Sequence, residues 1–159
     1  MSDKTNRNSP SRDYLQLGKA LSDQFFLLEG KRPRILVGGT IDPLSRSKNK
    51  ICNSLADMGY DVDLSPKVNI LKNLLNQCLE NDTDVVLIYG ADCFSVQELL
   101  DFQDKILSDQ PHIVMSLLEQ NSEYYSNCEE KLDQWILFKS EDNPYVIGYN
   151  LLNQLLLSS

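Results

Sequence analysis

The sequence of 159 residues has few of the side chains that build metal sites or nucleophilic active sites. It contains one histidine, His112, and four widely spaced cysteines, Cys52, Cys78, Cys93 and Cys128. A zinc site usually takes closely paired cysteine and histidine ligands. A nucleophilic cysteine, serine or threonine needs a basic partner, and none can be identified here. We therefore expect no metal site, no catalytic residue and reduced cysteines.

Long apolar runs are also missing. No segment approaches the roughly 20 apolar residues that cross a bilayer. Residues 1–12 are polar throughout and lack the apolar core of a secretory signal. The chain is also shorter than the roughly 250 residues of a (β/α)8 barrel. These absences favour one cytoplasmic domain that does not associate with membranes.

Basic residues are outnumbered, since 15 lysines and arginines face 23 aspartates and glutamates, which gives a net charge of −8. Nucleic-acid binding needs a cationic face, so this balance argues against it. The basic residues concentrate in residues 31–50. Among them, Arg46, Lys48 and Lys50 fall near the start of a predicted helix, where cations oppose the helix dipole. A small anion bound between Gly38 and Lys50 would relieve that conflict, and a solvated helix face is the simpler alternative.

The sequence does contain a regular alternation of strand-like and helix-like segments. Residues 1–12 are expected to form a disordered tail, and apolar spacing predicts a helix over residues 13–30. Short apolar runs predict five strands, at residues 34–37, 60–64, 85–89, 112–118 and 135–138. Helical spacing separates them, at residues 44–58, 68–79, 95–106 and 144–155, with a weaker helix near 120–130.

This alternation predicts an α/β domain over residues 31–159, built on right-handed βαβ units. We expect a flavodoxin-like (Rossmann-like) parallel sheet of five strands in the order 2-1-3-4-5, with helices on both faces. Ligands of such sheets bind beyond the carboxyl ends of the strands. The loops that follow the predicted strands are therefore the places where chemistry is expected.

Two stretches carry a family resemblance, GKRPRILV at residues 30–37 and LADMGYDVD at residues 55–63. They resemble the cobalamin-binding domain of methylmalonyl-CoA mutase, and the resemblance extends over roughly residues 13–157. It implies the same five-stranded fold. It also implies three cofactor motifs, each placed after a strand.

The first of these motifs is Asp-x-His-x-x-Gly, whose histidine is the lower ligand of the cobalt in the family. Here Asp42 is retained, Leu44 stands at the histidine position and Ser47 stands at the glycine position. Leucine has no lone pair, so it cannot bind cobalt. Asp42 is then expected to cap the following helix instead.

The other two motifs shape the cavity for the nucleotide tail of the cofactor in the family. Tyr89 falls at the serine of a Ser-x-Leu motif, and Leu117 and Leu118 fall at a Gly-Gly motif. Each change adds side-chain volume where the family leaves space, and apolar side chains that fill a pocket favour a closed core. We therefore expect no bound cofactor and only vestigial motif positions.

The resemblance thus points to a non-catalytic, cobalamin-binding-like domain whose work is protein interaction. The expected partner is a mutase-type barrel subunit or a second copy of the chain. If the protein belongs to an enzyme, it is a subunit of a cobalamin-dependent acyl-CoA mutase, an isomerase. The alternative is a corrinoid carrier that binds cobalamin without a histidine lower ligand.

Overall fold

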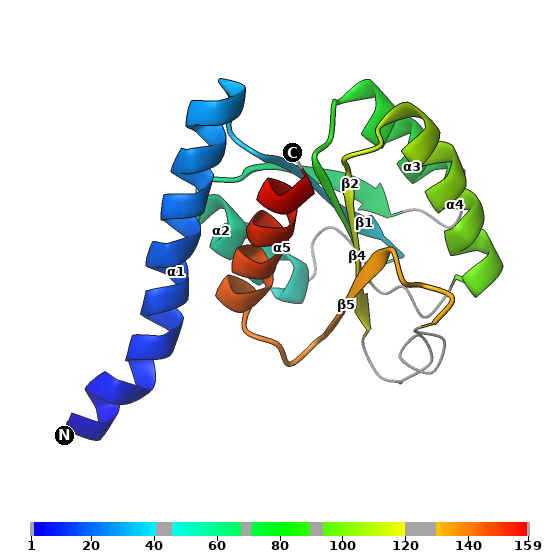
Figure 1. Cartoon of the computed structure of the whole chain (residues 1–159). Helices are drawn as coiled ribbons and strands as arrows, with labels where there is room; N and C mark the ends of the chain where they lie inside the picture. The colour runs from blue at the N-terminus through cyan, green and yellow to red at the C-terminus, as the bar shows by residue number, and fades with distance from the viewer. Residues whose placement is uncertain (1, 41–45, 68–70, 90–93, 120–129, 159) are drawn as a thin grey trace.

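The computed structural model describes residues 2–40, 46–67, 71–89, 94–119 and 130–158. Its centre is a parallel sheet of five strands in the order β2-β1-β3-β4-β5 (Figure 1). The predicted fold class and strand order are confirmed. The strands are β1 (Arg34–Gly39), β2 (Asp61–Lys67), β3 (Val85–Tyr89), β4 (Val114–Glu119) and β5 (Trp135–Lys139).

Helices cover both faces of the sheet (Figure 1). One face carries α1 (Ser2–Glu29), α2 (Arg46–Asp57) and α5 (Pro144–Ser158), and the other carries α3 (Leu71–Glu80) and α4 (Val96–Asp109). Every residue of β3 and β4 is buried, because helices exclude water from both sides. This explains the continuous apolar run of β3, in which no polar residue alternates.

Successive residues of a strand point to opposite faces, so the sheet separates two apolar cores. Val85, Leu87 and Tyr89 of β3 pack with α1, α2 and α5. Val86 and Ile88 pack with α3 and α4.

Most element boundaries differ from the sequence prediction, among them the start of α1 and the end of β2. Helix α1 begins at Ser2 and therefore runs through the residues expected to form a tail. Residues 2–12 are polar, so they offer no apolar periodicity from which a helix could be predicted. Strand β2 continues to Lys67, which pairs with Gly39 after a register shift in β1. The weak helix predicted near 120–130 lies almost wholly outside the described residues.

Two glycines allow α1 and α5 to approach the end of α2. A Cβ atom added at Gly148 of α5 would lie 2.5 Å from Met58 Sδ, and one added at Gly18 of α1 would overlap Met58 Cε. Met58 itself is completely buried, so its side chain occupies the space that both glycines leave. Among the described helices, none combines the length and the apolar character that crossing a bilayer requires.

Candidate functional site

The sequence predicts that any ligand would bind at the carboxyl edge of the sheet, where the strands end. Of the six motif positions, Asp42 and Leu44 lie outside the described residues, and Ser47 lies in the first turn of α2. The side chains of Tyr89, Leu117 and Leu118 are described, and all three are buried.

The sheet separates these three side chains. Tyr89 and Leu118 are register partners on β3 and β4, and both belong to the core beneath α1, α2 and α5. Leu117 belongs to the core on the opposite face, against α3 and α4. The expectation that both leucines fill one space is therefore corrected: only Tyr89 and Leu118 can fill the same space.

A pocket of about 380 Å³ lies at this edge, beside Tyr89 and Leu118. Tyr89 and Leu118 are 4% and 2% exposed, so they form its inner wall. The outer walls come from α2 and from the connection between β5 and α5, with Lys50, Ile51, residues 140–143, Pro144 and Ile147. On the side of the sheet, the pocket is therefore closed by Tyr89 and Leu118. Both side chains are larger than those that the resemblance implies at these motif positions.

The basic residues at the start of α2 do not share one environment. Arg46 and Lys50 are exposed, whereas Lys48 is completely buried and its Nζ donates to Ser65 O of β2 at 3.3 Å. Lys48 is therefore no part of a solvated helix face. Burial raises the pKa of the neighbouring Cys52 thiol, and the charge of Lys48 opposes this shift. The predicted anion between Gly38 and Lys50 stays a prediction.

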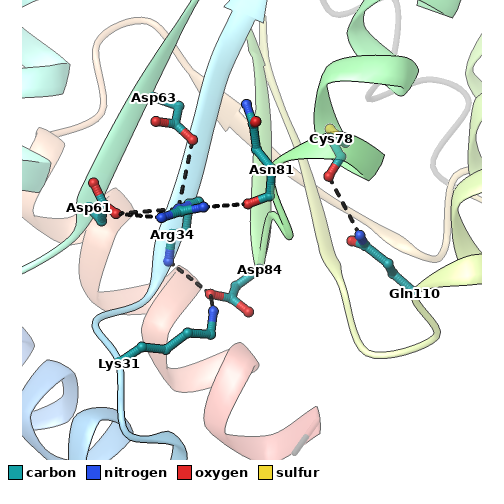
Figure 2. Close-up of polar contacts among 8 residues, drawn as sticks. All are labelled: Lys31, Arg34, Asp61, Asp63, Cys78, Asn81, Asp84 and Gln110. Atoms are coloured by element: carbon teal, nitrogen blue, oxygen red, sulfur yellow. Dashed lines mark hydrogen bonds and ion pairs between the residues drawn. The ribbon is translucent and has the colours of Figure 1, made fainter.

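The amino edge of the sheet, where the strands begin, holds a polar network that the sequence reasoning did not single out (Figure 2). Asp84, just before β3, accepts hydrogen bonds at Oδ2 from Lys31 Nζ at 2.6 Å and from the backbone N–H of Arg34 at 2.9 Å. The carboxylate thereby links the residue before β3 to the start of β1. This is possible because β1 and β3 are adjacent and parallel.

The Arg34 guanidinium is held on its other side (Figure 2). Its Nη1 donates to Asn81 O at 2.6 Å, and its Nη2 lies 3.1 Å from Asp61 Oδ2. Asp63 Oδ2 lies 3.8 Å from Nε. Arg34 therefore directs its charge toward β2, and Lys31 is the cation that faces Asp84.

A cavity of about 670 Å³ opens beside this network, and we call it the amino-edge cavity. Among its walls are Thr83 and Gln110, from the loops that precede β3 and β4. Thr83 Oγ1 and Gln110 Oε1 are buried, and neither makes a hydrogen bond of good geometry. The Cys78 thiol lies near the Thr83 hydroxyl, but sulfur is a weak partner. An unsatisfied buried polar atom costs about 1–3 kcal/mol, so these two atoms need an explanation.

The sequence reasoning missed the amino-edge cavity because it searched only the loops after strands. A signal was available in the charged residues at and just before the starts of β1 and β3, namely Lys31, Arg34, Asp82 and Asp84. In the described part of the chain, no three histidine, cysteine, aspartate or glutamate side chains are grouped closely enough to bind a metal ion.

Comparison with known proteins gives partial similarity to methylmalonyl-CoA mutases. The chain is 37% identical to methylmalonyl-CoA mutase of Escherichia coli (strain K12) over 68 residues, which are 42% of this chain and 10% of that protein. It is 38% identical to the methylmalonyl-CoA mutase large subunit of Streptomyces virginiae over 69 residues, or 43% of this chain and 9% of that protein. The corresponding large subunit of Propionibacterium freudenreichii subsp. shermanii is 32% identical over 81 residues, or 50% of this chain and 11% of that protein.

The matched segments therefore span about a tenth of each of these relatives. No family model matches the chain. Together, the partial similarity and the flavodoxin-like fold support a mutase-related domain.

Proposed function

We propose that the chain is a non-catalytic, mutase-related module that does not bind cobalamin in the manner of its relatives. The observation that carries the proposal is the burial of Tyr89 and Leu118 side by side at the ends of β3 and β4. The resemblance assigns small side chains to these positions, on the face where the nucleotide tail would need space. A phenol ring and a leucine side chain occupy that space instead.

The sequence of the first loop supports the same proposal. Leu44 stands at the position of the cobalt-binding histidine, and His112 comes before β4, at the other edge of the sheet. A bound corrinoid would therefore have no protein ligand from this loop, and the space that Tyr89 and Leu118 fill would not be open to its tail.

The proposed role is docking on a protein. The segment matched in each relative named above is about a tenth of that protein's length. We propose a mutase-type barrel subunit as the partner, with a second copy of the chain as the other candidate. An acidic chain with a net charge of −8 would approach a basic surface faster than a neutral one, because complementary charge raises association rates.

A corrinoid carrier is the second candidate function, and the pocket of about 380 Å³ at the carboxyl edge is the observation in its favour. Such a carrier would hold cobalamin with the cofactor's own base still attached. It would need no histidine at position 44 and no deep cavity beneath β3 and β4.

An absorbance titration of the purified chain with hydroxocobalamin and adenosylcobalamin separates the two functions. We expect no change in the cobalamin spectrum up to a protein concentration of about 100 μM. Micromolar binding with a shifted spectrum would establish the carrier instead. Affinity purification of the tagged chain from its own host, followed by mass spectrometry, tests the partner, and light scattering of the purified chain tests self-association.

Variants test whether side-chain volume is the cause. Leu44→His alone should not bind cobalamin, because Tyr89 and Leu118 still fill the cavity. Adding Tyr89→Ser and Leu118→Gly should open it and allow histidine-ligated binding. The matched control is Leu44→His with Leu117→Gly, which removes the same side chain as Leu118→Gly but on the opposite face, and it should not bind cobalamin. Tight binding by Leu44→His alone would refute the filled-cavity explanation.

A further inference from the structure

The amino-edge cavity is independent of the positions discussed above, because it lies where the strands begin rather than where they end. Its volume of about 670 Å³ is within the roughly 300–1,000 Å³ of small-molecule sites. Its walls come from the ends of α1 and α5, from the residues before β1, and from the loops before β3 and β4. Several segments distant in sequence thus converge on one concave surface.

The charge around this cavity is negative. Three carboxylates line it, those of Glu29, Asp82 and Asp84. Among the described residues that line the cavity, Lys31 pairs with Asp84, and Arg34 pairs with Asp61 and Asp63 of β2, neither of which lines it. The carboxylates of Glu29 and Asp82 therefore favour a cationic group there.

The unused hydrogen-bonding capacity of the walls consists mainly of acceptors. Thr83 is 3% exposed and its Oγ1 has no partner of good geometry; Gln110 is only partly buried, but its Oε1 is buried and also has no such partner. Both hydrogen bonds that Asp84 accepts go to Oδ2, which leaves its Oδ1 as a further acceptor. The Gln110 amide donates one long hydrogen bond of 3.5 Å from Nε2 to Cys78 O (Figure 2). A group with several N–H donors would use these acceptors.

Part of the cavity wall is apolar. Phe25, Ile113 and Leu155 line it and are 3%, 8% and 4% exposed. From the charge, the acceptors and this wall together, we propose that the amino-edge cavity binds a small organic amine, in which a primary ammonium is carried on an apolar body. The ammonium would lie among Asp82, Asp84 and Gln110, and the body would lie against the apolar wall.

Amide chemical shifts of the complete, ¹⁵N-labelled chain test the proposal with 2-phenylethylamine as the probe. We expect saturable shifts at residues 82–84 and 110–113. Two control compounds keep the aromatic body but carry a carboxylate or a hydroxyl in place of the ammonium. These compounds, 3-phenylpropionate and 2-phenylethanol, should bind at least about tenfold more weakly. The absence of saturable shifts with the amine, or equal binding of the carboxylate, would overturn the proposal. Nα-acetyl-lysine methylamide tests the other source of an ammonium, and tighter binding of this compound would assign the site to a lysine of a protein partner instead.

Three variants test the assigned acceptors. Thr83→Val keeps the side-chain shape, Gln110→Met keeps its length, and Asp82→Asn keeps a residue type that tolerates the positive φ of 51° at this position. Each should weaken amine binding about three- to tenfold. The matched control is Ser116→Ala, because Ser116 is also buried but its hydroxyl is satisfied by Val86 O. Unchanged affinity in all three variants, in chains that unfold cooperatively on heating, would refute the site.

Discussion

The two hydrogen bonds that Asp84 accepts contribute differently to the stability of the protein. The partner Lys31 Nζ belongs to a side chain that is 48% exposed, and exposed ion pairs contribute about 0–1 kcal/mol. The other donor is the backbone N–H of Arg34 at the start of β1. Asp84→Ala should therefore lower the free energy of unfolding by about 1–2 kcal/mol, mainly because this N–H loses its acceptor.

Urea denaturation of matched variants checks this assignment. Asp84→Asn retains an acceptor oxygen and loses only the charge. It should therefore lower the free energy of unfolding by less than half as much as Asp84→Ala. Lys31→Ala keeps the acceptor of the Arg34 N–H and removes the ion pair together with the ammonium contact to the Phe25 ring, and it should stay within about 1 kcal/mol of the wild type. A cost for Lys31→Ala as large as that for Asp84→Ala would show that the ion pair dominates.

At the same scale, the sequence predicted only part of the candidate sites. The enlarged positions 89, 117 and 118 could be found by counting along motifs, because a motif fixes the residue number. The face of the sheet on which each side chain lies could not be found in that way, since a shift of one residue along a strand moves a side chain to the other face. The network around Asp84 depends on contacts between residues 31–34 and residue 84, and no local pattern shows a contact of that sequence separation.

The packing of α1 and α5 around Met58 gives a prediction for these helices. Alanine at Gly148 would gain about 1 kcal/mol of helix propensity. Its Cβ would, however, lie 2.5 Å from Met58 Sδ and 3.0 Å from Leu55 Cδ2. We therefore expect Gly148→Ala to destabilise the protein by about 1–3 kcal/mol, the usual cost of overpacking.

A double-mutant cycle with Met58→Ala isolates the cause, measured by chemical denaturation. In the Met58→Ala background, Gly148→Ala should be nearly neutral or stabilising, because the obstructing side chain is gone. Gly18→Ala should cost less than Gly148→Ala, since only the flexible end of Met58 must move. Asn150→Ala, an exposed site on the same helix, serves as the control and should change stability by less than about 0.5 kcal/mol. Equal costs of Gly148→Ala in both backgrounds would contradict the packing argument.

The elements themselves were the most predictable part of the structure. Strand β3 is a short apolar run ending near a glycine, and α4 is preceded by the N-cap residue Ser95, which forms a capping box with Glu98, so local residue types specify both. The strand order followed from the alternation of strands and helices. The beginning of α1 could not be predicted, because residues 2–12 are polar and carry no periodic signal of a buried face.

For the whole molecule, buried acidic groups, among them Cys78 and Tyr60, set an alkaline limit to stability. Burial raises the pKa of the Cys78 thiol to about 12, with a small opposing effect of the Thr83 hydroxyl. Burial also raises the pKa of Tyr60 well above its ordinary value of 10.0, and the neutral phenol donates to Gly148 O at 2.7 Å. Both groups keep their protons in the folded protein at a pH where the unfolded chain has lost them.

The sign of the effect follows from this difference. When the folded state binds more protons than the unfolded state, the free energy of unfolding falls as pH rises. The contribution of Cys78 is complete below about pH 9, the ordinary pKa of a cysteine, and is lost as pH rises toward 12. The contribution of Tyr60 follows the same course from about pH 10 upward. We therefore expect the urea midpoint to fall steadily above pH 9 under reducing conditions.

The Cys78→Ala variant shows whether the thiol causes the first part of this decline. It should be less stable than the wild type at pH 7, because a buried side chain is shortened. Its free energy of unfolding should nevertheless fall less between pH 8 and pH 10, by about 1 kcal/mol, since alanine has no proton to release. Tyr60→Phe should reduce the fall of the unfolding free energy with pH only above pH 10. At pH 7 it should lower the free energy of unfolding by about 1 kcal/mol, because the hydrogen bond is lost. Parallel curves for the wild type and Cys78→Ala between pH 8 and pH 10 would show that this thiol is not the group that titrates on unfolding.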